Sequence, residues 1–324
     1  MALTQESNPP QARLAILGAG AVGCYFGVRF TQFGGSVVLI GRPAFAAAAA
    51  RDGIRFESGG SATSVKVEAT ADPAAVAGAD YVLVCTKTTD GPEAVRFCAP
   101  HLKPDGALLL LQNGVDNAQR IEATLGELDI DRDVFPAVVY VAAEQLGPAA
   151  IRHTARGDLV VGDGRAPGPR TALRRAKLDR FVDLCARAGV PCRLSEDMTT
   201  DLWSKMVMNC AFNAVSGLGE ATYGEILECP PAFELMHAAI REAIAVARAE
   251  GARLDEQERL EYARRLAVSM RTVSSSMAHD MQRRRRTEIA SLNGYISRRA
   301  KEFRIATPAN DALTALVMLR SRES

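Results

Sequence analysis

Three polar side chains recur at four-residue intervals in an otherwise apolar segment, and their types and spacing could do chemistry. Lys205, Asn209 and Asn213 occupy positions i, i+4 and i+8. On a helix this spacing places an ammonium group and two amides on one line. A helix that buries most of its surface carries such a line where it faces a wet cleft or a ligand. An internal hydrogen-bond network, or the solvent face of an amphipathic helix, would give the same pattern.

A glycine-rich turn is the second chemical signal, because it follows an apolar strand pattern and opens a helical one. It consists of Gly18, Ala19, Gly20, Ala21, Val22 and Gly23. In a dinucleotide-binding turn, Gly18 permits the tight bend, Gly20 lets a pyrophosphate approach the backbone, and Gly23 lets helix and strand pack closely. The helix N-terminus adds N–H donors and a positive dipole. We predict that these six residues bind a dinucleotide; an ordinary strand-to-helix turn is the alternative.

The end of the second strand pattern indicates which dinucleotide is bound. An NAD-specific site has Asp or Glu there, about 20 residues after the turn, whereas this chain has Gly41 and Arg42. The guanidinium of Arg42 can bind a 2′-phosphate and stack near adenine. We therefore predict NADPH as the cofactor, with a solvated arginine as the alternative. Lys87, directly after the third strand, is predicted to reach the cofactor or the substrate, unless it is a surface lysine.

The elements that must position these residues follow the rhythm of a parallel α/β sheet. Strands are predicted over residues 13–17, 36–40, 81–86, 107–112 and 134–142, and helices over 22–33, 92–102 and 116–125. Residues 54–68 add one or two irregular strands, and a hairpin is predicted near 151–161. A Gly- and Pro-rich loop over 162–170 precedes a helix over 171–188 and a strand over 190–195. From residue 197 only helical patterns remain, with breaks at Pro230-Pro231, Gly251 and Pro308.

Two domains follow from this pattern and from the length of 324 residues, which exceeds what one hydrophobic core usually supports. We predict a Rossmann-type dinucleotide-binding domain over residues 1–196, with 1–12 as a disordered tail, and an all-helical C-terminal domain over 197–324. A cleft is expected where the carboxyl ends of the parallel strands open toward the second domain, and a substrate would bind there.

The composition of the chain indicates which kinds of partner it could bind. The sequence has no apolar run long enough to span a bilayer and no signal-peptide pattern at its start, which predicts a cytoplasmic protein without membrane attachment. With 39 basic and 38 acidic residues there is no field to attract nucleic acid, and Arg283 to Arg286 are interpreted as a solvated helical face. Seven cysteines without metal-ligand spacing predict reduced thiols and no metal. The oligomeric state is open, with a homodimer as one expectation.

Several segments together resemble the ketopantoate reductase, or 2-dehydropantoate 2-reductase, family over nearly the whole chain from residue 13. They are GAGAVG, Thr86-Lys87, Gln112-Asn113-Gly114, LWSKMVMNCAFN, SSSM and RRTEIASLNGY. The resemblance implies that Lys205 is the catalytic acid and that Glu288 completes the site. It also implies substrate contacts by Asn113, Asn209, Asn213 and Ser276, and cofactor contacts by Gly18, Gly20, Gly23, Arg42, Lys87, Asn113 and Glu288.

These residue types suit the reduction of a ketone. Hydride transfer to a ketone leaves an alkoxide, which a lysine ammonium can protonate where partial desolvation lowers its pKa toward neutrality. Glu288 would hold the ammonium and limit that fall in pKa. Amides suit a substrate hydroxyl, while a hydroxyl such as Ser276 and an amide such as Asn113 suit a carboxylate. Three of these residues could have a structural role in place of a role in the site. Ser276 could be a helix-interior hydroxyl, Glu288 a partner of the preceding arginines, and Asn113 a turn former.

One position departs from the family pattern, since Val273 stands three residues before Ser276 where family members often have asparagine. The predicted function is NADPH-dependent reduction of 2-dehydropantoate to (R)-pantoate, a step toward pantothenate and coenzyme A. Val273 favours the alternative of a related reductase for another 2-oxo or 3-oxo acid. A non-catalytic NADPH-binding sensor is the third hypothesis, although a sensor would not need a lysine beside the nicotinamide.

Overall fold

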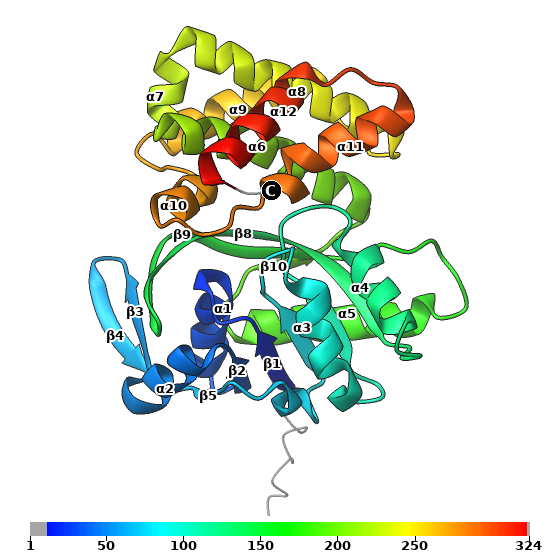
Figure 1. The fold of residues 1–324 in the computed structure, drawn as a ribbon. Coiled ribbons are helices and arrows are strands. Elements are labelled where there is room, and N and C mark those ends of the chain that lie inside the picture. Colours follow the sequence, from blue (N-terminus) through cyan, green and yellow to red (C-terminus); the bar gives the residue numbers. More distant parts are fainter. Residues whose placement is uncertain (1–11, 323–324) are drawn as a thin grey trace, which may run out of the picture. The chain divides into compact units, whose positions relative to one another are not determined.

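The computed structural model describes residues 12–322, and the chain divides into two compact units (Figure 1). The first unit extends to Gln112 and resumes over Asp116–Met198, while the second comprises Asn113–Val115 and the chain from Thr199 onward. A tripeptide from the middle of the first unit's sequence therefore belongs to the second. The predicted boundary was 196/197, and the tail predicted at residues 1–12 lies outside the described residues, except for Ala12.

The first unit contains a ten-stranded sheet with the order β4-β3-β9-β8-β7-β6-β1-β2-β5, in which β10 also pairs with β9. Its parallel part comprises β1 (Arg13–Leu17), β2 (Ser36–Ile40), β5 (Glu68–Thr70), β6 (Tyr81–Val84), β7 (Ala107–Leu110) and the start of β8 (Asp133–Gly147). Its helices are α1 (Ala21–Gln32), α2 (Pro43–Asp52), α3 (Gly91–Cys98), α4 (Asn117–Gly126) and α5 (Thr171–Arg187), with short 3₁₀ turns at Pro73–Val76 and Ala99–His101.

Helices cover both faces of this sheet, which explains why its parallel strands are continuous apolar runs. Along β1, Leu14 and Ile16 join the core that contains residues of α1 and α5. Ala15 and Leu17 point the other way and join the core that contains residues of α3 and α4. The predicted Rossmann-type domain followed by a helical domain is confirmed.

The hairpin predicted near residues 151–161 was misplaced. Residues 151–161 do not form a hairpin by themselves: β9 (Ala150–Val161) is one strand, antiparallel to β8, and the turn between them lies at Pro148 and Ala149. Arg156 and Gly157 have φ angles of 61° and 144°, and the register shifts beside them. This β-bulge interrupts the side-chain alternation as a turn would.

Residues 54–65 form two strands, which agrees with the predicted one or two, and a third strand, β5, begins at Glu68. The strands β3 (Ile54–Ser58) and β4 (Ser61–Val65) make a hairpin, while β5 pairs with β2 and β3 pairs with β9. The predicted helix over 92–102 ends at Cys98 and continues only as a 3₁₀ turn, because Pro100 has no N–H to donate. The predicted strand over 190–195 is shorter, as β10 (Cys192–Leu194).

A buried ionic network joins α5 to the start of β8. Asp133, with 1% of its surface exposed, accepts from Arg174 at 2.8 Å and Lys177 at 2.6 Å. Arg174 also bonds Asp163 at 2.6 Å, and the exposed Arg170 reaches Asp133 at 2.9 Å. Charges that are buried in this way stabilise a fold only when each has a partner.

The second unit is helical throughout its described residues after Thr199, apart from turns and connecting segments. Its helices are α6 (Met198–Gly219), α7 (Tyr223–Glu228), α8 (Pro230–Ala249), α9 (Glu256–Ser269), α10 (Ser276–Gln282), α11 (Asn293–Phe303) and α12 (Pro308–Ser321), with a 3₁₀ turn at Ile289–Ser291. The breaks predicted at Pro230, Gly251 and Pro308 are confirmed. No helix of residues 12–322 is long and apolar enough to cross a membrane.

Buried amides fasten the helices of this unit to one another. The side chain of Asn293 donates to the carbonyl of Cys210 on α6 at 2.9 Å and to Asn310 Oδ1 at 3.0 Å. Asn310 in turn donates to Glu242 on α8 at 2.7 Å, and Glu242 accepts the backbone N–H of Ala309. The helix that carries the predicted lysine is thereby held to α8, α11 and α12.

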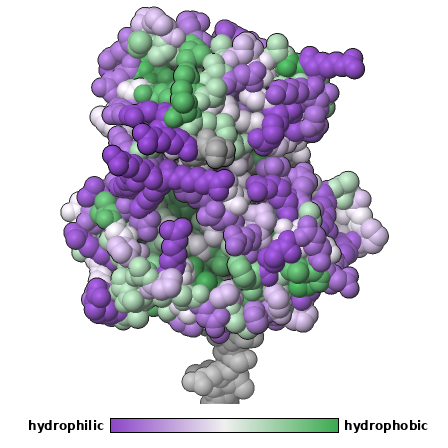
Figure 2. All heavy atoms as spheres, viewed as in Figure 1, coloured by the Kyte–Doolittle hydropathy of each residue, from purple (hydrophilic) through white to green (hydrophobic). Residues whose placement is uncertain are grey.

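The surface of this unit differs from the predicted one in one place. Arg283 to Arg286 do not lie on a helix, because α10 ends at Gln282 and Arg284 adopts a φ of 52°. All four arginines are exposed. Hydrophobic side chains gather elsewhere on the unit (Figure 2), and α12 exposes Leu316 and Leu319.

Candidate active site

The glycine-rich turn joins β1 to α1 and is shaped by contacts that exclude side chains. Gly18 has a φ of 111°, and a Cβ there would lie 2.6 Å from the backbone nitrogen of Thr86. A Cβ on Gly23 would lie 1.9 Å from the carbonyl oxygen of Gly18. Gly20, the N-cap of α1, differs from both, because a Cβ there would meet no atom within 4 Å. The fold itself therefore requires Gly18 and Gly23 but leaves room at Gly20.

The N-terminus of α1 has the chemistry of an anion site. No side chain caps it, and Ala21 and Val22 begin the helix directly after Gly20. Its first N–H groups and its dipole are the features that bind phosphate groups at helix N-termini. The open space beside Gly20 and these uncapped donors fit the pyrophosphate of a dinucleotide.

Replacing Gly20 by alanine is expected to leave the fold intact and to weaken dinucleotide binding. The added methyl group meets no protein atom but occupies the space through which the pyrophosphate approaches the backbone. We expect an unchanged thermal midpoint and a Kd for NADPH at least about tenfold higher by fluorescence titration. Gly126→Ala is the matched control, since it is equally open but lies at the end of α4. Equal affinity in the two variants would refute the placement of the pyrophosphate.

Arg42 lies beside this turn, at the N-cap of α2. A Cβ on the preceding Gly41 would lie 2.6 Å from the Cβ of Ala19, so the segment after β2 packs against the glycine-rich turn. The Arg42 side chain is exposed. This is the place along the chain where the ribose-binding residue of a dinucleotide site is expected.

Lys87 is held through its backbone by Gln112, which the sequence interpretation did not assign to the site. The amide nitrogen of Gln112 donates to the carbonyls of Thr86 and Lys87, both at 3.1 Å. Gln112 is buried two residues after the end of β7, and Gly91 leaves room for its amide. The only sequence signal for this bridge was the occurrence of Thr86-Lys87 and Gln112 among the segments shared with the family.

Beneath the turn, two cysteines serve as neutral packing groups. Burial raises the pKa of Cys24 to about 12, and burial together with Cys24 raises that of Cys85. The Cβ of Cys85 lies 3.2 Å from where a Cβ on Gly23 would be. Thiols in this environment stay protonated at neutral pH and are poor nucleophiles.

In the second unit, the predicted polar stripe lies on one helix, α6. Lys205 and Asn209 are half-buried and Asn213 is 5% exposed, so the stripe is not a solvent face. The flanking Trp203 and Phe212 are buried in the helical core. The helix therefore presents its ammonium group and two amides in surroundings that are partly or wholly withdrawn from water.

Asn113 connects this stripe to Glu288. Its side-chain nitrogen donates to Glu288 Oε2 at 2.9 Å, and its oxygen accepts from the side chain of Asn209 at 3.5 Å. Asn113 belongs to the second unit, so these three residues form one cluster within it. Residues that are 96 and 175 positions apart in sequence are thus brought together by the fold.

Ser276 is placed at the first turn of α10 and is exposed, whereas its neighbour Ser275 is buried and caps that helix. The hydroxyl of Ser275 donates to the backbone carbonyl of Asn213 at 3.1 Å. Val273 is half-buried in the segment that leads to α10. The sequence interpretation missed Ser275, because three consecutive serines give no periodic signal.

Comparison with known proteins identifies the family. Residues 14–166 match the model described as Ketopantoate reductase PanE/ApbA, and residues 197–321 match the model of its C-terminal part. The chain belongs to the ketopantoate reductase family. It is accordingly an oxidoreductase of a family that uses pyridine nucleotides.

Relatives in the ketopantoate reductase family match over nearly full length. The 2-dehydropantoate 2-reductase of Halobacterium salinarum is 30% identical over 314 residues, which are 96% of this chain and 99% of the relative. The structure of a PanE/ApbA family ketopantoate reductase from Ralstonia eutropha JMP134 has a TM-score of 0.86 at 39% identity, covering 96% and 99% of the two chains. A ternary structure of D-mandelate dehydrogenase with NADH and anilino(oxo)acetate has a TM-score of 0.87, covering 96% and 98%, but its 22% identity shows the shared fold alone.

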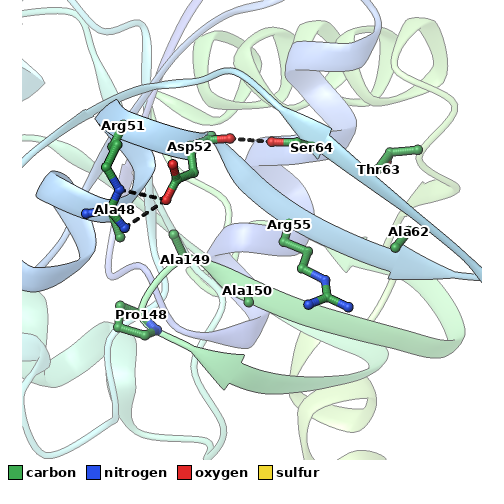
Figure 3. A pocket seen from close by; sticks show the side chains of 11 residues that line it. Ala48, Arg51, Asp52, Arg55, Ala62, Thr63, Ser64, Pro148, Ala149 and Ala150 are labelled. Carbon is green, nitrogen blue, oxygen red and sulfur yellow. Dashed lines mark hydrogen bonds and ion pairs between the residues drawn. The ribbon is translucent and has the colours of Figure 1, made fainter.

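The residues that line a cavity in the first unit are not among those expected to act in a ketopantoate reductase. It measures about 560 Å³ and is bordered by the end of α2, the β3–β4 hairpin and the turn between β8 and β9 (Figure 3). Its charged residues are Arg51 and Asp52, which pair with each other, and Arg55, which pairs with Glu57 outside the lining. Residues 12–322 contain no cluster of His, Cys, Asp or Glu that could hold a metal ion.

Proposed function

We propose that the protein reduces 2-dehydropantoate to (R)-pantoate with NADPH as the hydride donor. The observation that carries this proposal is the cluster in which Asn113 joins Glu288 to the stripe of Lys205, Asn209 and Asn213. The cluster combines a proton donor, a carboxylate and amides within one unit. A sensor without catalytic activity would not need that combination.

The chain's residues would divide the reaction as follows. NADPH, when bound at Gly18 to Gly23 and Arg42, supplies the hydride. Lys205 gives a proton to the ketone oxygen as negative charge develops there. Glu288 favours the charged form of the lysine, and Asn113 fixes the orientation of Glu288 by its 2.9 Å bond.

The substrate would be recognised at both ends. Ser276 and Asn113 suit the carboxylate, while Asn209 and Asn213 suit the terminal hydroxyl. Val273 is then not needed as a polar contact, and an apolar side chain favours the two methyl groups of 2-dehydropantoate.

Turnover of a small panel of 2-oxo acids tests this assignment. We expect kcat/KM for 2-dehydropantoate to exceed that for 2-oxoisovalerate, which lacks the hydroxyl, by at least about tenfold, because buried amides without a partner cost roughly 1 to 3 kcal/mol. Absorbance of the reduced nicotinamide gives the rates. Equal rates, or a preference for 2-oxoisovalerate, would favour the second candidate, a reductase for another 2-oxo or 3-oxo acid, which Val273 in place of asparagine supports.

The proposed choice of NADPH rests on Arg42 in place of an acidic residue. We expect NADPH to be preferred over NADH. We expect Arg42→Ala to weaken the binding of NADPH by roughly 1.5 to 3 kcal/mol, which is the value of a charge-assisted phosphate contact. Binding of NADH should change little, which makes NADH the internal control. A wild-type enzyme with equal kcat/KM for both cofactors would show that Arg42 does not select the phosphate. The homodimer and the cytoplasmic location stay predictions.

A further inference from the structure

The segment between α9 and α10 is tied to its neighbours along its backbone. The N–H of Tyr223 donates to the carbonyl of Val273 at 2.9 Å, and the N–H of Gly224 donates to the carbonyl of Arg271 at 3.0 Å. A Cβ on Gly224 would lie 2.9 Å from that same carbonyl oxygen. The start of α7 therefore holds residues 271–273 at close range.

Two buried serines complete this attachment. Ser216 on α6 accepts the backbone N–H of Ser275 at 3.0 Å and donates to the carbonyl of Ala221 at 2.7 Å. Ser275 donates to the carbonyl of Asn213 at 3.1 Å and accepts the N–H of Ala278 at 3.0 Å. Both are at most 1% exposed. Each hydroxyl thus both donates and accepts, which fixes the direction of every bond in the pair.

The attachment is made directly beside residues of the proposed substrate site. Ser275 bonds the backbone of Asn213 and precedes Ser276, and Val273 lies two residues before it. Close packing supports the same geometry, because a Cβ on Gly217 would lie 2.8 Å from Met281 Sδ of α10. Hydrogen bonds of the two serines therefore lie between Asn213 on one side and Ser276 on the other.

We propose that Ser216 and Ser275 are positioning residues that set the distance between the amide of Asn213 and the segment carrying Val273 and Ser276, and that they thereby govern which keto acid is bound. This inference rests on the proposed function. Neither serine takes part in proton or hydride transfer. Their removal would let the segment move away from α6, which changes how both ends of a keto acid are held and leaves Lys205 in place.

Steady-state kinetics of Ser275→Ala and Ser216→Ala test the proposal. We expect KM for 2-dehydropantoate to rise at least about tenfold, which corresponds to the loss of about one hydrogen bond, with kcat within about threefold of wild type. The preference for 2-dehydropantoate over 2-oxoisovalerate should fall in parallel. Ser275→Thr keeps a capping hydroxyl and should restore KM.

The control variant Asp255→Ala distinguishes an effect on substrate positioning from a general loss of stability. Asp255 caps α9 in the same unit, through a bond of 2.7 Å to Glu258, and its loss removes a helix cap at the end of α9 far from the segment. We expect a lower thermal midpoint with unchanged KM. If Ser275→Ala and Ser216→Ala behaved like Asp255→Ala, the serines would be structural only and the proposal would be overturned. Ser216→Ala leaves the cap of α10 in place, so the test survives misfolding of Ser275→Ala.

The proposed function fails by a different result, namely a wild-type preference for another oxo acid. In that case the same comparison of KM is made with the preferred acid. An unchanged KM for that acid in both serine variants overturns the positioning role, and a raised one supports it.

Discussion

Replacing Lys205 by alanine is expected to lower kcat by roughly 100-fold or more while NADPH binding survives, because general acid catalysis typically contributes that much. Lys205 lies on α6, half-buried, one and two turns before the amides of Asn209 and Asn213. The alkoxide formed by hydride transfer would then have to take its proton from water. Stopped-flow or steady-state absorbance measures kcat, and fluorescence titration measures the Kd for NADPH.

Ser204→Ala is the matched control for this variant. Ser204 is the half-buried neighbour of Lys205 on the same helix but lies outside the polar stripe. The control should keep near-normal turnover. Near-normal turnover of Lys205→Ala at neutral pH would remove the lysine from the chemistry and leave the stripe with a structural role.

The second large effect is expected on stability, from Asp133→Asn. Asp133 is buried against Arg174 and Lys177. The variant removes the negative charge that faces the buried side chains of Arg174 and Lys177. Breaking a buried ion pair in this way lowers the free energy of unfolding by roughly 3 to 5 kcal/mol. Urea denaturation at pH 7 measures that difference.

The same site makes stability depend on pH. Burial raises the pKa of Asp133, but the hydrogen bonds of Lys177 and Arg174 and the charges of Lys177 and Arg170 outweigh it, so the net pKa is lowered in the folded state. The contribution of the Asp133 carboxylate to the free energy of unfolding is therefore complete above the unfolded-state pKa of about 3.9. It is lost as the pH falls through the lower folded-state pKa. Asp133→Asn should lose this part of the acid dependence.

Asp131→Asn is the control, since Asp131 bonds Arg170 of the same helix segment but is exposed. An exposed pair contributes about 0 to 1 kcal/mol. Similar losses in the two variants would show that the burial of Asp133 does not matter energetically.

The sequence predicted the fold where local patterns determine it. The bounds of β1 and β2 were predicted correctly, because β-branched and apolar residues lie between clear turn residues. The same reasoning failed at the bulge of Arg156 and Gly157, since the bulge imitates a turn and depends on pairing with Tyr140 and Val141 of β8. Periodicity carries no information about partners of that kind.

In the candidate site, too, local spacing could be predicted from the sequence and contacts between distant residues could not. The stripe on α6 follows from helical spacing alone, and its placement on a helix is confirmed. That Asn113 and Glu288 belong to one site was implied only by the family resemblance, and the hydrogen bond between them across 175 positions was not predicted. Gln112 and Ser275 act through backbone carbonyls of residues far along the chain, so their side-chain types gave no hint of their partners.

The division of the chain has a consequence for modularity. Asn113 and the two residues after it belong to the helical unit although the chain returns to the first unit at Asp116. A fragment cut at residue 199 would lack Asn113, which donates to Glu288 and accepts from Asn209. A chimera that grafts the helical part onto a foreign nucleotide-binding domain would therefore inherit the lysine without its amide bridge, unless the loop after that domain's matching strand were recoded as Asn-Gly-Val. Recombination at the apparent domain border is thus restricted by three residues that lie outside it.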